Sequence, residues 1–382
     1  MDVTLLPGFD AQGDVDQRTA RRVAQAWLAG GIVGLPTETV YGLAADAQDP
    51  EAVARIYRAK GRPADHPLIV HVVGPEALLG WSADASPAAA RLAEAFWPGP
   101  LTVVVRRGPR AGDFVTGGQD TVALRCPGHP VARACIRALA ELSGDAARGV
   151  AAPSANRFGR VSPTRAQDVV AEVGDRLDPR RDLVVDGGPC AVGVESTIVD
   201  CTVDPPRVLR LRAISQAQVD AALAERSTAG PTAPPAKPAV APVDAGGEGA
   251  PTDQVRAPGT LQSHYAPHAR VLLIEPSIDG ESHLVDRTAR IESTELSATA
   301  LDQPTEGAGT GLIAARAVRT PAGWVRLLAA EDAESYARDL YAALRQADEL
   351  GLRRVVAVLP HPDGGPLATA VRDRLARAAH RD

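Results

Sequence analysis

The sequence predicts an α/β protein of two domains, and three observations carry that prediction. Helix and strand patterns alternate along most of the chain. Hydrophobic residues make up 45% of the sequence but aromatic residues only 3%, so the core must be built from aliphatic side chains. Residues 227–257, STAGPTAPPAKPAVAPVDAGGEGAPTDQVRA, are rich in Pro, Ala and Gly, a composition typical of a linker. With 382 residues, the chain is long for one domain. We therefore expect a larger domain over 1–225 that carries the functional site, a linker over 226–269 and a smaller domain over 270–382.

The first domain begins with a helix and then alternates helices with short strands. Residues 16–29 are predicted to be helical because apolar residues recur one turn apart and Gly30 follows as a stop. Asp49 is the expected N-cap of a second helix, with proline in its first turn, which ends at Gly61. The same signals predict further helices over 129–141, 164–173 and from Ser215, and strands over 32–35, 68–73, 101–105, 121–124, 183–186, 197–199 and 208–211.

The second domain shows the same alternation on a smaller scale. A helix is predicted over 335–350, because Tyr336, Leu340 and Leu344 fall on one face. A final helix is expected over 367–379, and strands over 271–274, 311–314 and 355–359. This order is typical of a small open α/β sheet.

Composition excludes several classes of protein. The net charge of -6 and the pI near 5.8 argue against a protein that coats nucleic acid. The four cysteines form no CxxC pair, and we expect them to be reduced thiols in the core. The first residues, MDVTLLPGFDAQGD, do not resemble a signal peptide, and no run of residues is apolar and long enough to span a membrane. We therefore expect a cytoplasmic protein.

The first chemically informative run is LPTETVYGLAADA, residues 35–47. It follows a predicted strand and combines hydroxyl groups and a carboxylate (Thr37, Glu38, Thr39 and Tyr41) with apolar neighbours. An ordinary turn would favour Gly, Asn or Asp instead. A strand that uses threonine for its β-propensity is the alternative interpretation.

The second run is YRAKGRPADHPLIVH, residues 57–71. Only two of the 41 basic residues are lysines, Lys60 and Lys237, so a lysine beside Arg62 favours a specific use. A compact ammonium and a planar guanidinium together suit a polyphosphate. Capping of the helix C-terminus is the simpler explanation of Lys60. The other lysine, Lys237, lies in the linker, so the small number of lysines does not by itself indicate a function for Lys60.

The third run, AAPSANRFGRVSPT over 151–164, places a polar loop between a strand and a helix. Its hydroxyl and backbone N–H groups suit a phosphate or a ribose, although a plain connecting loop is an equal alternative. Arg125 and Arg210 each end a strand, where they would pair with a carboxylate or a phosphate, or form a surface ion pair. Such an inventory describes a site that holds anionic reactants and offsets their charge.

Residues 263–269, SHYAPHA, lie at the far end of the linker. His264 and His268 are four residues apart, a spacing that binds metal on a helix, but Pro267 disfavours a helix there. We therefore do not expect a metal site in this segment.

Seven motifs in order resemble the Sua5/YrdC/YwlC family. They are PTETVYGL, KGRP with PLIVH, WPGPLT, ALRCP, APSANRFGRVSPT, GVESTIVD and a final HYAP, and they span about 31–212 and 258–267. The resemblance implies a YrdC-like N-terminal domain with a twisted mixed sheet, flanking helices and a concave cleft. The additional C-terminal domain is similar in position to the smaller Rossmann-like Sua5 domain of the long family members.

The resemblance also implies a reaction. Family members are nucleotidyltransferases that convert L-threonine, bicarbonate and ATP into L-threonylcarbamoyladenylate, pyrophosphate and water. The product serves N6-threonylcarbamoylation of adenosine 37 in tRNA, which a downstream transferase complex completes; direct tRNA binding is not required. The threonine amine becomes a carbamate, which attacks the α-phosphorus of ATP. Mg²⁺ is expected on the phosphates, without dedicated protein ligands.

Two sets of binding residues follow from the matched motifs. The L-threonine positions are Thr39, His71, Arg125, Ala152 and Ser196. The ATP positions are Arg62, His66, Thr121, Ser154, Asn156, Ser162, Arg210 and Tyr265, the last of which would fold over the nucleotide as a lid. Lys60, Arg62 and Arg125 are the expected catalytic residues, because they would neutralise developing negative charge.

Two positions depart from the family pattern, and one alternative function remains. His66 stands where family members commonly carry Asn, which makes its contact pH-sensitive. Residues 210–212 read RLR instead of RPG, which leaves the direction of Arg210 less certain than that of Arg125. The alternative is an RNA-binding or scaffold protein of the same fold, which the acidic net charge and the few aromatic residues disfavour.

Overall fold

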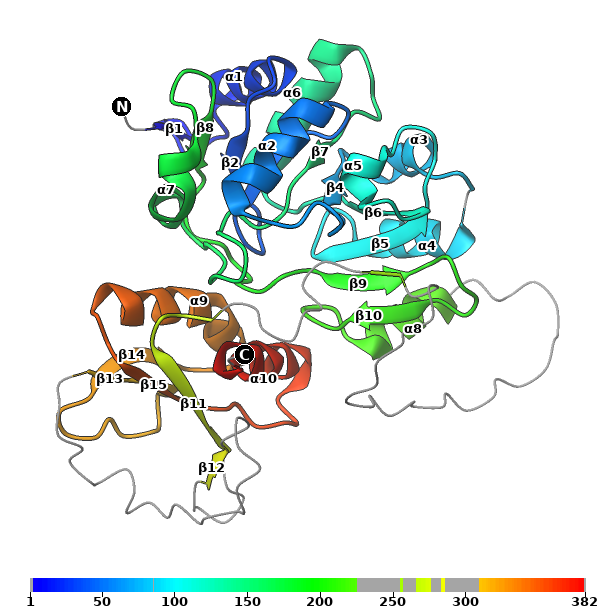
Figure 1. The fold of residues 1–382 in the computed structure, drawn as a ribbon. Coiled ribbons are helices and arrows are strands. Elements are labelled where there is room, and N and C mark those ends of the chain that lie inside the picture. Colours follow the sequence, from blue (N-terminus) through cyan, green and yellow to red (C-terminus); the bar gives the residue numbers. More distant parts are fainter. Residues whose placement is uncertain are drawn as a thin grey trace, which may run out of the picture.

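The computed structural model describes residues 3–84, 86–224, 255–256, 266–275, 283–285 and 309–380. They form two α/β domains, one built around a ten-stranded sheet and the other around a five-stranded sheet (Figure 1). The expected α/β class with two domains is confirmed. Most of the expected linker over 226–269, including Tyr265 and His264, lies outside the described residues.

The larger sheet is mixed, with parallel and antiparallel neighbours. Its strand order is β1-β8-β2-β3-β7-β4-β6-β5-β9-β10. The strands are β1 (Thr4–Pro7), β2 (Val33–Leu35), β3 (Gly42–Asp46), β4 (Ile69–His71), β5 (Leu101–Arg106), β6 (Thr121–Arg125), β7 (Val150–Ala151), β8 (Leu183–Asp186), β9 (Thr197–Asp200) and β10 (Arg207–Arg210).

Helices cover both faces of one half of this sheet, because the buried residues of its strands alternate between faces. In β8, Leu183 and Val185 pack into one cluster with α1 (Gln17–Leu28) and α6 (Pro130–Ser143). Val184 between them packs into a second cluster with α2 (Pro50–Lys60) and α7 (Ala166–Val173). This period of two is the expected pattern of a strand buried on both faces.

The remaining helices pack around the other half of the sheet. They are α3 (Leu78–Trp81), α4 (Pro87–Phe96), α5 (Asp113–Thr116) and α8 (Gln216–Ala224), with the short 3-10 turn η1 (Pro75–Ala77). A second such turn, η2 (Gly174–Arg176), directly follows α7. On one face, a cluster includes Val103 and Leu124 together with Leu92 of α4. On the opposite face, Ile69, Val104 and Ala123 form a smaller cluster, and this face leads to the cleft described below.

The ends of the helices form where sequence capping signals lie. The Asp49 carboxylate accepts hydrogen bonds from the N–H groups of Glu51 and Ala52, and Gly61 ends α2 with a positive φ of 63°. Gly61 suits this left-handed position because it has no Cβ. At α8, Ser215 and Gln218 exchange side-chain to backbone hydrogen bonds, as their spacing predicts.

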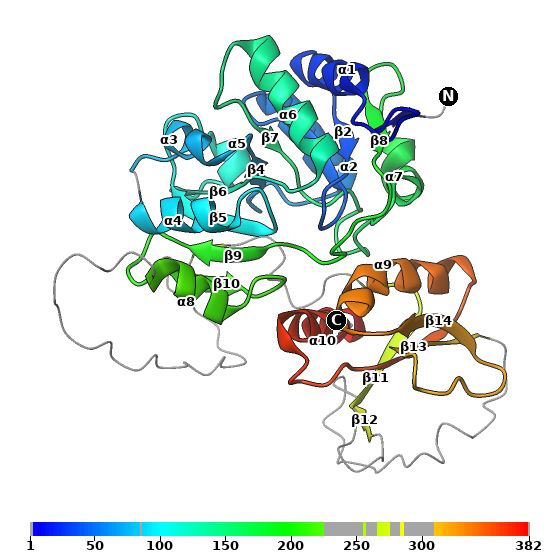
Figure 2. The ribbon, with the colours of Figure 1, turned by 180° about the vertical axis from the view of Figure 1, so that it is seen from behind.

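The smaller domain has the strand order β12-β11-β15-β13-β14. All pairs in it are parallel except the edge pair of β11 and β12. Its strands are β11 (Arg270–Glu275), β12 (His283–Val285), β13 (Thr310–Ala315), β14 (Val325–Ala330) and β15 (Arg354–Val358), and its helices are α9 (Ala333–Glu349) and α10 (Gly365–Ala379). Both helices lie between the small sheet and the larger domain (Figures 1 and 2).

The predicted elements agree with the structure to within a few residues, and the differences are mainly omissions. The sequence prediction missed β1, β3, β12, β14 and the helices α3, α4 and α5, and it marked β7 only as a strand end before the polar loop. β3 was missed because GLAAD carries no β-branched residue, and its burial in the centre of the sheet decides its conformation. All four cysteines are buried and free, as expected. Within the described part of the chain, none of the helices is both long and apolar enough to cross a bilayer.

Candidate active site

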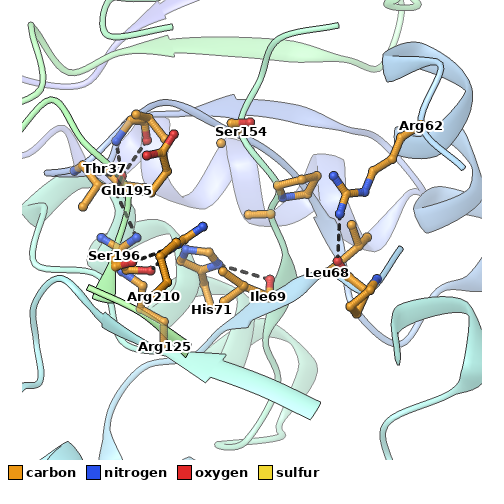
Figure 3. A pocket seen from close by; sticks show the side chains of 16 residues that line it. Thr37, Arg62, Leu68, Ile69, His71, Arg125, Ser154, Glu195, Ser196 and Arg210 are labelled. Carbon is orange, nitrogen blue, oxygen red and sulfur yellow. Dashed lines mark hydrogen bonds between the residues drawn. The ribbon is translucent and has the colours of Figure 1, made fainter. Parts of the chain in front are cut away.

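A pocket opens where β2, β4, β6 and the loop before β9 meet (Figure 3). Its wall alternates with the core, as the strand period requires: Ile69 and His71 of β4 line the pocket, while Val70 between them is buried in the core. The lining residues are Thr37, Thr39, Val40, Gly42, Arg62, Pro67, Leu68, Ile69, His71, Arg125, Ala152, Pro153, Ser154, Glu195, Ser196 and Arg210.

Arg125 ends β6 and is held on three sides. Its Nε donates to the carbonyl of Gly99 at 3.2 Å, Nη1 donates to the Thr39 hydroxyl at 2.9 Å and Nη2 donates to Glu38 Oε1 at 2.7 Å. Burial by itself raises the pKa of Glu38, but the charge and hydrogen bond of Arg125, together with backbone hydrogen bonds, outweigh burial and lower the pKa below its usual value. The guanidinium is thus fixed in one orientation before any substrate binds.

The turn after β2 presents hydroxyl groups to the same space. Thr37 Oγ1 lies 2.9 Å from Thr39 Oγ1 and donates to the carbonyl of Val40 at 2.6 Å. The backbone N–H groups of Thr39 and Val40 donate to Thr37 Oγ1, each at 3.2 Å. The hydrogen bonds of Thr37 therefore stabilise the turn. The threonines lie in this turn after β2, and not in a strand as the alternative interpretation has it.

His71 is the register neighbour of Arg125 on the adjacent parallel strand. Its ring is 3% exposed, and Nδ1 lies 3.4 Å from the carbonyl of Ile69. Burial lowers the pKa of His71 to about 3, and the neighbouring Arg125 adds to this effect. The imidazole is therefore neutral at physiological pH, so it offers a donor and an acceptor without adding charge.

The opposite wall is formed by Ser196 and Arg210. Arg210 ends β10 and donates from Nε to the Ser196 carbonyl at 2.9 Å and from Nη2 to the Ser196 hydroxyl at 3.2 Å. The same hydroxyl lies 2.7 Å from that of Thr102. Arg210 reaches the pocket despite the changed residues that follow it in the chain.

Arg62 lies at the third side, after the end of α2. Its Nη2 donates to the carbonyl of Pro67 at 3.1 Å, and its guanidinium carbon lies 5.8 Å from the centre of the Phe158 ring. His66 contacts the same phenyl ring edge-on, with ring centres 5.4 Å apart, and does not line the pocket.

Lys60 does not line the pocket. Its side chain is 2% exposed, and its ammonium donates to the carbonyls of Ser154 and Asn156. Burial lowers its pKa well below the usual value. The Lys60 ammonium therefore holds the 154–156 loop from behind the pocket wall, and its catalytic role stays a prediction.

The structure brings together most of the predicted residues. All five expected L-threonine positions line the pocket, as do Arg62, Ser154 and Arg210 of the ATP set. Asn156 and Ser162 are buried behind the wall, and Thr121 lies at the opposite end of β6 from Arg125. Tyr265 is outside the described residues, although Ala266, next in the chain, donates its N–H to the carbonyl of Gly159 at 3.3 Å.

Sequence reasoning singled out Thr37 and Glu38 but gave them no binding role, and it missed Glu195. Glu38 and Thr37 lie inside PTETVYGL, and the alternation of hydroxyls with a carboxylate was their only signal. Glu195 precedes Ser196 in GVESTIVD. Its partners Tyr341 and Arg374 belong to the other domain, and no sequence pattern indicates that they contact it.

The donor set of the pocket does not form a metal cage. Among the described residues of the wall, Glu195 alone carries a carboxylate, and Arg374 lies 2.8 Å from it. No group of three or more His, Cys, Asp or Glu side chains in the described residues is arranged to hold a metal ion. Hard divalent cations prefer several oxygen ligands, so the pocket side chains fit an ion that brings most of its ligands with the substrate.

Comparisons with known proteins agree with this geometry. A family model described as telomere recombination, Sua5_yciO_yrdC, matches residues 25–211, and a model described as threonylcarbamoyl-AMP synthase, C-terminal domain, matches residues 214–380. The threonylcarbamoyl-AMP synthase of Pyrococcus abyssi is 36% identical over 94% of this chain and 93% of its own length. That of Bacillus subtilis is 36% identical over 91% of this chain and 89% of its own length.

A solved structure shows the same two-domain fold. The crystal structure of P. abyssi Sua5 complexed with L-threonine superimposes with a TM-score of 0.77 at 34% identity, and the match covers 99% of this chain and 98% of the other. Both domains are therefore matched together. With both family models and near-complete coverage of these relatives, the chain belongs to the Sua5/YrdC/YwlC family, in its two-domain form.

Proposed function

We propose that this protein is a threonylcarbamoyl-AMP synthase, which makes L-threonylcarbamoyladenylate and pyrophosphate from L-threonine, bicarbonate and ATP. The observation that carries the proposal is the convergence of three guanidinium groups, those of Arg62, Arg125 and Arg210, on one pocket whose floor holds a neutral His71. A site with that charge suits two anionic reactants, an amino-acid carboxylate and a triphosphate.

We assign the two substrates to different sides of the pocket. Arg125 and the Thr39 hydroxyl form the side for L-threonine, because a fixed guanidinium recognises a carboxylate and a hydroxyl reads the polar groups beside it. Arg62, Ser154 and Arg210 form the side for ATP. Tyr265 remains a proposed lid, supported by the hydrogen bond that Ala266 makes to Gly159 near the polar loop.

The chemistry then needs positioning more than covalent participation. The threonine amine and bicarbonate form a carbamate and release water. A carbamate oxygen attacks the α-phosphorus, and the bond to the β,γ-phosphate breaks so that pyrophosphate leaves with the negative charge. Arginine side chains that are already fixed stabilise this charge without reorganising.

Mg²⁺ and the further partners complete the proposal. Mg²⁺ would enter with ATP, because the described residues of the pocket wall include one carboxylate, Glu195, and it is paired with Arg374. The product would pass to a tRNA threonylcarbamoyl-transferase complex in the cytoplasm. The RNA-binding alternative is not favoured, since the pocket is a small cleft rather than an open face with stacking aromatics.

The test is pyrophosphate release from ATP by the purified protein, with L-threonine and bicarbonate omitted in turn. We expect release to require both. Arg125→Ala should lower kcat/KM by about a hundredfold, the usual loss when one charge-stabilising donor is removed. Arg18→Ala is the matched control, because this arginine lies on α1 with a side chain 93% exposed. A folded wild-type protein that releases no pyrophosphate with every substrate present would refute the proposal.

A further inference from the structure

Glu195 connects the pocket to the C-terminal domain. It lines the pocket from the loop before β9, beside Ser196, and is only 7% exposed. Its carboxylate contacts Tyr341 of α9 and Arg374 of α10. These two helices lie on the side of the small sheet that faces the larger domain (Figure 1). One side chain is thus shared between the wall of the pocket and the domain interface.

Two groups from the C-terminal domain hold this carboxylate. The Tyr341 hydroxyl of α9 donates to Glu195 Oε1 at 2.9 Å, and Nε of Arg374 on α10 lies 2.8 Å from Oε2. Ser162 of the polar loop adds a longer contact to Oε1 at 3.4 Å. Arg374 is fully buried, so this ion pair lies between the domains rather than on the surface.

The loop that carries Glu195 is pressed against the C-terminal domain. Val194 packs in one apolar cluster with Tyr336, Leu340 and Leu344 of α9. A Cβ atom built on Gly193 would lie 2.5 Å from the carbonyl oxygen of Ala337, so the two backbones approach as closely as glycine allows. The position of Glu195 therefore depends on the docking of α9 and α10.

Because Glu195 is negatively charged, its dependence on the docking of α9 and α10 bears on the binding of anionic substrates. It is the one carboxylate among the described residues of the pocket wall, and the reactants assigned to the pocket are anions. Burial by itself raises the pKa of Glu195, but Arg374, followed by Arg210 and Arg212, outweighs it and lowers the pKa to about 2. The group is ionised, and a buried carboxylate without a counter-ion would repel a triphosphate strongly.

We propose that the C-terminal domain supplies, through Arg374, the counter-charge that makes the wall at Glu195 tolerant of the anionic nucleotide. Glu195 and Arg374 are then a positioning pair: neither needs to touch the reacting atoms, but ATP binds tightly only while they are paired. The inference rests on the proposed function, and it assigns to the second domain a direct part in substrate binding.

The test is a double-mutant cycle on the full chain, read by equilibrium titration with ATP. Arg374→Met removes the largest counter-charge of Glu195, leaves only the smaller contributions of Arg210 and Arg212, and should raise the Kd for ATP by about tenfold or more. Arg374→Lys keeps a charge at the site and should have a smaller effect. Glu195→Gln combined with Arg374→Met removes both charges and should restore the Kd to within about threefold of wild type.

Arg345→Met is the matched control. Arg345 also crosses the interface from α9, to Glu172 at 3.0 Å and to the carbonyl of Val161, but it pairs with no carboxylate of the pocket wall. We expect it to lower the melting temperature with little change in the Kd for ATP. A large rise in Kd here, equal to that of Arg374→Met, would show that loosened docking and not the charge of Glu195 matters.

The result that would overturn the inference is an Arg374→Met variant with an unchanged Kd, or a double variant as weak as the single one. If Arg374→Met does not fold, the double variant decides, because a tenfold weaker Kd in that folded protein contradicts the inference. ATP titration requires no turnover. A wild-type protein that releases no pyrophosphate refutes the proposed function, whereas a flat cycle in an active protein refutes only this inference.

Discussion

Two buried glutamate–arginine pairs border the pocket, and they differ in where their partners come from. Glu38 and Arg125 belong to the same domain, so the pair forms as that domain folds. Glu195 and Arg374 belong to different domains, and the pair exists only while α10 is docked. The first pair fixes a cation toward the substrate, and the second neutralises an anion beside it. The side of the pocket at Arg125 therefore forms within one domain, and we call it the preorganised side. The wall at Glu195 depends on the docking of the C-terminal domain, and we call it the conditional side.

Glu38→Gln should have the largest effect, because it breaks the pair within the domain and leaves the buried Arg125 without its carboxylate. Removing one partner of a buried pair costs about 3 kcal/mol of unfolding free energy. Urea unfolding measures that loss, and L-threonine titration should show weaker binding as Arg125 loses its orientation. Equal stability and unchanged threonine affinity would show that the three-sided hold on Arg125 is unnecessary.

Gly193→Ala should have an intermediate effect, confined to the conditional side. The residue has a φ of 73°, and a Cβ would meet the backbone of Ala337 and Arg338 at 2.5 Å. The strain and the displaced helix together should cost about 1–3 kcal/mol. ATP binding should weaken while L-threonine binding stays near wild type. A variant in which both affinities fall alike would remove the distinction between the two sides.

Between pH 7 and pH 5.5, the pH dependence of stability should show the smallest effect, about 1 kcal/mol, through His71. Its pKa is about 3 in the folded protein and about 6.5 when unfolded, so above pH 6.5 both states are neutral and its contribution is complete. As the pH falls below 6.5 the unfolded state gains a proton first, and stability is lost by about 1.4 kcal/mol per pH unit until about pH 3.

Comparison of wild type with His71→Gln isolates that contribution. His66 and His129, whose pKa values are also lowered by burial, act in the same direction in both proteins. Urea unfolding at pH 7 and pH 5.5 should show a shallower loss for the variant. Identical slopes would mean that His71 is not held neutral in the folded state.

The sequence alone predicted the preorganised side better than the conditional side. Thr39, His71 and Arg125 were found because each belongs to a motif that matched the family, and the strand register then brings them together. The local signals at Asp49 and Gly61 also placed α2 to within a residue, because capping depends on neighbours in the chain.

The rest depends on contacts that no local pattern encodes. The sequence does not show that the ammonium of Lys60 binds the carbonyls of Ser154 and Asn156, because those carbonyls lie 94 and 96 residues further along the chain. Glu195 and its partner Arg374 are 179 residues apart in the chain. A pair of that kind becomes visible only when the docking of two domains is known.

The central claim is that this pocket joins L-threonine, bicarbonate and ATP into one product. The most direct measurement is mass spectrometry of the reaction products with ¹³C-bicarbonate as the carbon source. We expect a product that contains both threonine and AMP and carries one ¹³C atom, formed in step with pyrophosphate. Pyrophosphate without that labelled product, or a folded and ATP-binding protein that forms neither, would contradict it.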